Sequence, residues 1–211
     1  MTRIIVVSAH PDDMEIGMGG TVAKFAEQGA EVTSIVLTDG AGSANPFSLT
    51  REQIIQIRRS ETQSAALQLG IKDTIFLEAT DLKNAAQYDA TRQKLAQCVE
   101  SLMPQEIYTL HPDLDRHPTH QLAGKMTLET ASGVAVWAYE VWGLFAKWDR
   151  LEDISNEIGK KLRAISEHAS QIAVFPFAEA VSGLNRWRAV FSDPQEKRVQ
   201  TLFAEVFLRL C

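Results

Sequence analysis

The stretch IIVVSAHPDD, residues 4–13, indicates the fold class because it places a buried strand directly before a cluster of polar side chains. Its first six residues are β-branched or small and carry no charge, which is typical of a strand covered on both faces of a parallel sheet. The next segment, residues 16–28, has apolar residues at helical spacing and ends at Gly29. A strand, a polar turn and a helix in this order indicate the first unit of an α/β domain.

The same alternation continues through most of the chain. Thr50 and Gln53 have the spacing of a capping box at the start of a helix that stops at Gly70. Further strands are expected at 31–37, 74–77, 106–110 and 134–141, and helices at 50–69, 88–103 and 120–131. Strands alternating with helices predict a Rossmann-like, mostly parallel sheet flanked by helices, which is a three-layer α/β/α fold.

The last part of the chain, residues 149–211, is less regular. Helices are expected at 154–172 and 177–191, and Asp193-Pro194 marks a turn. The apolar segment 202–210 is ambiguous between strand and helix. No change of composition marks a linker before it. We therefore expect a single domain over residues 1–211, with the last part packing on the same core.

The composition is that of an ordinary globular protein. Of 211 residues, 45% are hydrophobic and 23% are charged, which argues against a disordered or fibrous chain. The net charge of −6 disfavours nucleic-acid binding, and no apolar run approaches the roughly 18 residues of a membrane span. With two cysteines and no signal-peptide pattern, we expect a cytoplasmic protein with reduced thiols that binds neither nucleic acid nor membrane.

Three polar clusters follow expected strands, at residues 10–15, 38–40 and 111–120. Ligands of parallel α/β sheets bind beyond the carboxyl ends of the strands, so we expect the clusters to lie at one edge. Two of the clusters hold four of the five histidines of the chain. Histidines in proline-containing turns are the alternative, but that reading leaves the grouping unexplained.

His10, Asp13 and His120 are the expected ligands of a metal ion. The first two are three residues apart at a strand-to-helix turn, where Pro11 restricts the backbone, so both side chains can face one point. His120 opens the helix that follows the fourth strand. Two imidazoles, one carboxylate and an open position are typical of catalytic zinc, and the same set can hold Fe²⁺ or another divalent metal.

Hydrolysis at such a site also needs a base and a proton donor. Asp12 is the expected base, with a helix N-cap paired with Glu15 as its alternative role. His117 is the expected acid or oxyanion stabiliser, with a surface loop histidine as the alternative. Asp115 is expected to orient one of the imidazoles, with a plain loop carboxylate as the alternative.

These residues carry a resemblance to a known family. The stretch AHPDDME, residues 9–15, resembles the A-H-P-D-D-x-E signature of the LmbE/PIG-L deacetylases, metal-dependent hydrolases of N-acetylglucosamine-type amides. Further similar stretches follow in the same order: TDG at 38–40, RRSE at 58–61, AALQLG at 65–70, HPDLDRHPTH at 111–120, YEVW at 139–142, DIS at 153–155, HASQ at 168–171, AEA at 178–180 and GLNR at 183–186. The similarity spans roughly residues 3–191.

The resemblance implies a zinc-dependent hydrolase that removes the acetyl group from the amide nitrogen of an N-acetylglucosamine-containing small molecule or conjugate. It implies the three zinc ligands named above, with Asp12 as the base and His117 as the transition-state partner, and it suggests a homo-oligomer. It adds Arg58, expected to hold acyl or sugar oxygens of the substrate, with an ion pair to Glu52 or Glu61 as the alternative. Many members have an acid just before the last metal histidine, where this chain has Thr119. Either Asp115 orients the catalytic histidine here, or the acid is weaker.

The sequence also suggests two alternative functions for the chain. Gly17, Gly19 and Gly20 after a strand suggest a dinucleotide-binding loop, but the G-x-G-x-x-G pattern would need glycine at Val22. We expect Gly19 and Gly20 to let the first helix pack closely on the sheet instead. A non-catalytic metal-binding member of the same fold is the second alternative, although it would have no use for a base and an acid beside the metal.

Aromatic residues gather in the segment 137–148. They are Trp137, Tyr139, Trp142, Phe145 and Trp148. Core packing, a sugar-stacking wall and a subunit interface all remain open for them.

Overall fold

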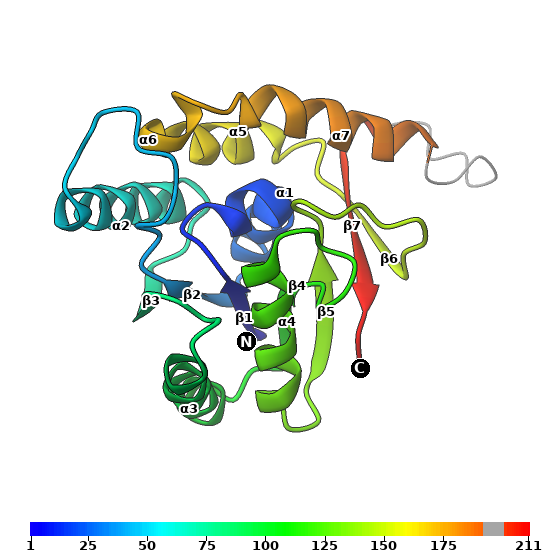
Figure 1. Ribbon diagram of the computed structural model, residues 1–211. Helices are drawn as coiled ribbons and strands as arrows, with labels where there is room; N and C mark the ends of the chain where they lie inside the picture. The colour runs from blue at the N-terminus through cyan, green and yellow to red at the C-terminus, as the bar shows by residue number, and fades with distance from the viewer. Residues whose placement is uncertain (192–200) are drawn as a thin grey trace.

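The computed structural model describes residues 1–191 and 201–211, and a twisted sheet lies at its centre (Figure 1). The strands are β1 (Arg3–Ser8), β2 (Glu31–Thr38), β3 (Asp73–Ala79), β4 (Glu106–Leu110), β5 (Ala135–Tyr139), β6 (Arg150–Asp153) and β7 (Ala204–Arg209). Their order in the sheet is β3-β2-β1-β4-β5-β7-β6. The first five in this order are parallel, and β7 runs antiparallel to both β5 and β6. The predicted fold class is therefore confirmed.

Helices cover both faces of the sheet. They are α1 (Asp13–Glu27), α2 (Arg51–Gln68), α3 (Ala85–Leu102), α4 (Pro118–Thr130), α5 (Ile158–Glu167), α6 (Ala169–Ile172) and α7 (Phe177–Phe191). The helices α3 and α4 lie on one face, and the other five lie on the opposite face (Figure 1). None of the described helices has the length and apolar character needed to cross a membrane.

The first elements form for the reasons that their sequences suggest. The residues of β1 from Ile4 to Val7 are at most 3% exposed, as expected of a strand between two helical layers. The capping box at the start of α2 is present, because the Thr50 hydroxyl accepts the N–H of Gln53 and the Gln53 side chain accepts the N–H of Thr50.

The last part of the chain differs from its prediction. The single helix expected over 154–172 is wrong, because β6 ends at Asp153 and His168 separates α5 from α6. The ambiguous apolar segment is β7, which lies in the sheet between β5 and β6. The expected turn at Asp193-Pro194 lies outside the described residues.

Glycines in α1 allow close packing, but not where we expected it. A Cβ on Gly17 would lie 2.2 Å from the Tyr139 ring of β5, so Gly17 is the glycine that brings the helix onto the sheet. Gly19 and Gly20 instead face Lys161 of α5 and Ile154, respectively. The expectation for these two glycines was therefore wrong, because their neighbours come from the last part of the chain.

The topology determines where a ligand can bind. The chain leaves β1 for β2 on one side, whereas β4 pairs with β1 on the other, so the strand order reverses at β1. Open α/β sheets bind their ligands at the carboxyl ends of the strands at this switch point. His10 follows β1 and the cluster 111–120 follows β4, so both lie at the switch point.

Candidate active site

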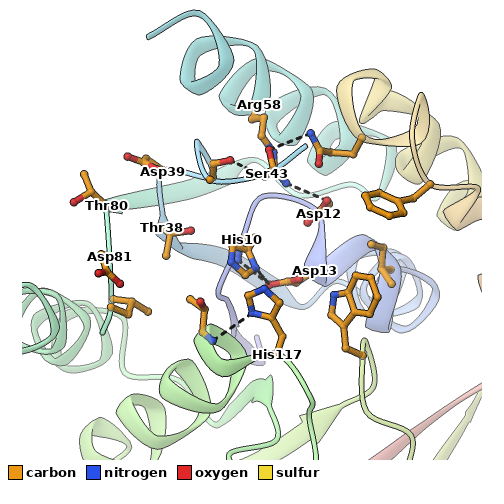
Figure 2. A pocket seen from close by; sticks show the side chains of 18 of the residues that line it. His10, Asp12, Asp13, Thr38, Asp39, Ser43, Arg58, Thr80, Asp81 and His117 are labelled. Atoms are coloured by element: carbon orange, nitrogen blue, oxygen red, sulfur yellow. Dashed lines mark hydrogen bonds and ion pairs between the residues drawn. The ribbon is translucent and has the colours of Figure 1, made fainter. Parts of the chain in front are cut away.

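A cavity of about 310 Å³ opens at this edge of the sheet. It is lined from the β1–α1 turn, the loops after β2 and β3, the start of α4, the segment after β5 and the region of α6 and α7. Figure 2 shows His10, Asp13 and His117 at its centre. His111 does not line it, because its Nδ1 accepts the N–H groups of Asp113 and Leu114 in a turn.

Candidate ligand atoms of three residues, His10, Asp13 and His120, converge at the cavity. His10 Nδ1 lies 3.0 Å from His120 Nε2, and His120 Nε2 lies 3.2 Å from Asp13 Oδ1. The third separation, between His10 Nδ1 and Asp13 Oδ2, is 3.7 Å. Neighbouring ligand atoms of a tetrahedral zinc are about 3.3 Å apart, because zinc–ligand bonds measure about 2.0–2.2 Å. These three residues could therefore hold such a metal.

The electrostatics of the three residues favour a bound cation. Burial lowers the pKa of His120, but the facing carboxylates of Asp13 and Asp115 raise it to about 10. Burial raises the pKa of Asp13, and the two histidines more than offset this, so that it lies well below its ordinary range. Without a metal, the carboxylates of Asp13 and Asp115 therefore keep His120 protonated. A bound metal ion would supply that positive charge instead.

Asp115 supports the imidazole of His120 rather than that of His117. Its Oδ2 lies 3.1 Å from His120 Nδ1, which leaves Nε2 of that ring for the metal. Its Oδ1 accepts the backbone N–H of His117, and the N–H of Trp142 also reaches Oδ2. Of the two imidazoles open to Asp115 from the sequence, the structure therefore places it on the candidate ligand.

The hydrogen bonds of His117 identify the nitrogen that carries its proton. Its Nδ1 accepts the N–H of Thr119 at the start of α4, so the proton of the neutral ring is on Nε2. Burial and the neighbouring His10 and His120 lower its pKa to about 4. One nitrogen of His117 lies within 4.8 Å of nitrogens of the other two rings. Asp13 is the more suitable third ligand, because its oxygens lie closer to both.

Asp12 lies next to this group in a strained conformation. Its φ of 130° is rare for a residue other than glycine. Asp12 occupies the N-cap position of α1, but its side chain makes no capping hydrogen bond, so the alternative of a capping box with Glu15 is wrong. Arg58 lies 3.0 Å from its Oδ2 (Figure 2). Burial raises the pKa of Asp12, and Arg58 partly opposes that rise.

Arg58 is buried and binds three groups of the β1–α1 turn and the loop after β2. It is 2% exposed, and besides Asp12 it donates to the carbonyl oxygens of Pro11 and Gly40. The alternative ion pairs with Glu52 or Glu61 are wrong, because Glu61 instead accepts the N–H and hydroxyl of Ser170 in α6. Arg58 thus ties α2 to the turn that carries Asp12.

Comparison with known proteins shows which family this chain belongs to. The model of the family PIG-L, described as GlcNAc-PI de-N-acetylase, matches residues 5–131. The chain belongs to the PIG-L family. The probable N-acetyl-alpha-D-glucosaminyl L-malate deacetylase 2 of Bacillus anthracis is 26% identical over 221 residues, which cover 97% of this chain and 93% of that protein.

Two solved structures share the PIG-L fold along the whole chain. N,N'-diacetylchitobiose deacetylase from Pyrococcus horikoshii has a TM-score of 0.82 and 22% identity, covering 99% of this chain and 84% of its own. GalB, the 4-carboxy-2-hydroxymuconate hydratase of Pseudomonas putida, has a TM-score of 0.86 and 24% identity, covering 100% and 97%. The two proteins differ in the reaction that they are named for, so the fold alone does not select the chemistry.

Two buried residues near Asp12 form a pair that the sequence did not predict. His168 and Glu15 are each 1% exposed, and His168 Nε2 lies 3.6 Å from Glu15 Oε2. Burial lowers the pKa of His168, but Glu15 and Asp12 raise it above its ordinary value. The HASQ stretch that resembles the family was the signal that could have drawn attention to His168.

The aromatic segment divides between the core and the cavity. Trp137, Tyr139 and Phe145 are buried, whereas Trp142 lines the cavity and is 46% exposed. Trp148 packs on the guanidinium of Arg188, outside the cavity lining. Two further aromatic residues of the cavity, Phe175 and Phe177, were missed, because nothing in the local sequence places them in the same cavity as His10 and Asp13.

Proposed function

We propose that this member of the PIG-L family is a zinc-dependent N-deacetylase of an N-acetylglucosamine-containing small molecule or conjugate. The convergence of His10, Asp13 and His120 beside a candidate base, Asp12, is the observation that carries the proposal. The names of relatives, among them the Bacillus anthracis protein and a diacetylchitobiose deacetylase of Thermococcus kodakarensis, support it.

The three ligand residues supply a negative, partly enclosed site for a divalent metal. His10 and His120 offer ring nitrogens, and Asp13 offers a carboxylate oxygen. When bound, Zn²⁺ lowers the pKa of a water molecule and polarises a substrate carbonyl. Asp115 keeps His120 in the tautomer whose Nε2 faces the site.

Asp12 is the proposed base. Its carboxylate takes a proton from the attacking water and passes it to the amide nitrogen, which leaves as an amine. A raised pKa suits this role, because a stronger base accepts the proton more readily. We assign Arg58 as a positioning residue for Asp12, because its guanidinium is already bound to Asp12 and to two backbone carbonyls.

His117 is the proposed stabiliser of the oxyanion. A neutral ring with its proton on Nε2 can donate a hydrogen bond to the oxygen of the tetrahedral intermediate. Protonating Nδ1 as well would break its contact with the N–H of Thr119. Of the two roles left open by the sequence, the hydrogen-bond donor is therefore favoured over the general acid.

A metal-dependent hydratase is the second candidate that the fold admits. GalB is named for a substrate with several carboxylates, which calls for cationic side chains beside the metal. Among the described residues that line the cavity, Arg58 is the one lysine or arginine, and it is bound to Asp12. The deacetylase is therefore the better-supported function.

Metal removal and reloading test the proposal. Purified protein stripped by a chelator should release no acetate from N-acetylglucosamine or its glycosides, and reloading with Zn²⁺ or Fe²⁺ should restore the release. The absence of acetate from every compound of this panel with either metal would contradict the deacetylase function and favour a non-catalytic member.

Two histidine variants test the ligand assignment. His120→Ala should lose both zinc and activity, because it removes one of three ligands. His111→Ala is the matched control, since His111 belongs to the same cluster but its Nδ1 accepts backbone N–H groups of a turn, and it should retain zinc. Stoichiometric zinc in His120→Ala would remove His120 from the ligand set.

A further inference from the structure

The cavity has two chemically different sides. Thr38, Asp39, Thr80 and Asp81, from the ends of β2 and β3, form its polar side (Figure 2). Trp142, Phe175 and Phe177, from the segment after β5 and the start of α7, line the same cavity; we call these three residues the aromatic wall. Two of the candidate metal ligands, His10 and Asp13, line the same cavity.

The aromatic wall is ordered by its own contacts but is not covered by the protein. The rings of Trp142 and Phe175 meet edge to face with centroids 6.5 Å apart, and those of Phe175 and Phe177 are stacked at 5.3 Å. Trp142 and Phe175 nevertheless remain 46% and 37% exposed. Grouped, exposed aromatic rings in a cavity are typical of a surface that a ligand covers.

The position of Trp142 links the wall to the reacting centre. Its backbone N–H donates to Asp115 Oδ2, the same oxygen that contacts His120 Nδ1. The Asp115 carboxylate therefore contacts both the candidate ligand His120 and the backbone of Trp142, a residue of the aromatic wall. A substrate whose acyl group lies at the metal would have its neighbouring substituent within reach of these rings.

The charges of the cavity disfavour an anionic substituent. Four aspartates line it, namely Asp12, Asp13, Asp39 and Asp81. The lining has one lysine or arginine among the described residues, Arg58, and that side chain is 2% exposed and engaged by Asp12. Asp39 is neutralised by Arg51, which does not itself line this cavity. A carboxylated group such as malate would have no free lysine or arginine of the described lining to pair with.

We propose, on the basis of the deacetylase function above, that the substrate is a neutral N-acylated amino sugar bearing a flat apolar substituent that packs on the aromatic wall. The sugar hydroxyls bind the polar side, where Thr80 and Asp81 offer hydroxyl and carboxylate groups. The wall thus determines specificity, and it selects against carboxylated conjugates of the same sugar.

Kinetics on matched glycosides of N-acetylglucosamine test the proposal. The probes are the phenyl, methyl and L-malyl glycosides, the first two as both anomers, with zinc-loaded protein. For the preferred anomer, kcat/KM should be about tenfold higher for the phenyl than for the methyl compound, and lowest for the malyl compound. Trp142→Ala retains the backbone N–H to Asp115, so it should remove the phenyl preference and bring the phenyl-to-methyl ratio of kcat/KM to about one.

Trp187→Ala is the matched control, because Trp187 is 49% exposed on α7 but lies outside the cavity lining. It should leave all the ratios unchanged. A malyl compound that is hydrolysed as fast as the phenyl compound, or a phenyl preference that survives in Trp142→Ala, would overturn the proposal while leaving deacetylation intact.

Binding separates this proposal from the function on which it rests. The amine products, phenyl and methyl glucosaminide, can be titrated calorimetrically into the zinc-loaded protein without any hydrolysis. Trp142→Ala should weaken the phenyl compound about tenfold and the methyl compound little. Equal binding of the two compounds by the unaltered protein would overturn the wall assignment even if no acetyl group were ever released.

Discussion

At the scale of single residues, Asp12 combines a strained backbone with the proposed role of catalytic base. A φ of 130° in a residue other than glycine requires about 1–3 kcal/mol of compensation from the surrounding structure. Arg58 contributes to it by holding the carboxylate and the preceding carbonyl. Asp12→Asn keeps the shape of the side chain, and asparagine, like aspartate, is among the residues that adopt positive φ more often than others. The amide cannot accept the proton, so the variant should lower kcat by at least about 10²-fold with zinc content unchanged. Acetate release and metal analysis measure the two quantities.

Asp113→Asn is the matched control for this change. Asp113 is an exposed carboxylate of the cluster 111–120 and does not line the cavity. It should retain both zinc and full turnover. If Asp12→Asn lost its zinc, Asp12 would belong with the ligands and the base would have to be sought elsewhere.

His117 gives a prediction about pH. A pKa of about 4 means that the ring is neutral from pH 5 to 9, and a bound dication would lower the pKa further. His117→Gln keeps an N–H donor and should retain more activity than His117→Ala, which should lose about 10²–10³-fold in kcat. The shape of the pH–rate profile between pH 5 and 9 should be the same in the unaltered protein and in His117→Gln. Loss of a basic limb in the glutamine variant would show that His117 acts as a protonated acid.

The meeting of His10, Asp13 and His120 could be predicted from the sequence. His10 and Asp13 are three residues apart after β1, and His120 belongs to the cluster that follows the neighbouring strand β4. The partners of Arg58 and Asp115 could not. Arg58 has acidic neighbours along its own helix, but it turns to a loop 47 residues away in the chain. The ring that Asp115 contacts depends on which imidazole already has a backbone partner, and only the three-dimensional path of the turn shows that.

At the scale of elements, helix α1 depends on a residue from the end of the chain. Met18 has non-helical dihedral angles, and beyond this break the N–H groups of Gly20 and Thr21 donate to the two oxygens of Glu205 in β7. The buried ammonium of Lys161 in α5 binds the same carboxylate at 2.6 Å. Glu205→Gln leaves that ammonium without its counter-charge, so the free energy of unfolding in urea should fall by about 3–5 kcal/mol.

The exposed pair of Lys160 and Glu27 joins the same two helices and serves as the control. Glu27→Gln should change the free energy of unfolding by less than about 1 kcal/mol, because exposed ion pairs contribute little. Adding Lys161→Met to Glu205→Gln should recover part of the loss by removing the unpaired charge. Equal effects of the buried and the exposed substitution would contradict the capping role of Glu205.

Elements formed by local pattern were predictable, and those formed by distant pairing were not. The strands β1 to β5 and helices α1 to α4 follow from apolar periodicity, caps and glycine stops. Strand β7 is a short apolar run whose partners lie in β5 and β6, far back in the chain. His168 interrupts an otherwise helical pattern, and its burial beside Glu15 is a tertiary contact that no local signal indicates.

At the scale of the whole molecule, the candidate metal ligands join both helical layers. Asp13 opens α1 on one face of the sheet, and His120 lies in α4 on the other (Figure 1). His10 follows β1 between them. A bound cation would therefore link the two layers through the central strand, so metal binding should stabilise the fold as a whole.

The pH dependence of stability tests that link without any substrate. In the metal-free protein the pKa of His120 is about 10 in the folded state against an ordinary 6.5, so the folded state binds the extra proton. This contribution to stability is fully present below pH 6.5 and is lost as the pH rises through about 10. The free energy of unfolding of chelator-treated protein should therefore fall by up to about 1.4 kcal/mol per pH unit between pH 7 and 8.5.

Zinc should abolish this slope, because the metal takes the place of the proton between Asp13 and Asp115. Urea unfolding at pH 7, 7.75 and 8.5, with zinc and with chelator, isolates the difference from groups common to both forms. His120→Asn should unfold with the same pH dependence in both conditions. Parallel slopes for the zinc-loaded and chelator-treated unaltered protein would mean that no metal displaces the proton of His120, and His120 would then be a structural residue of the sheet edge.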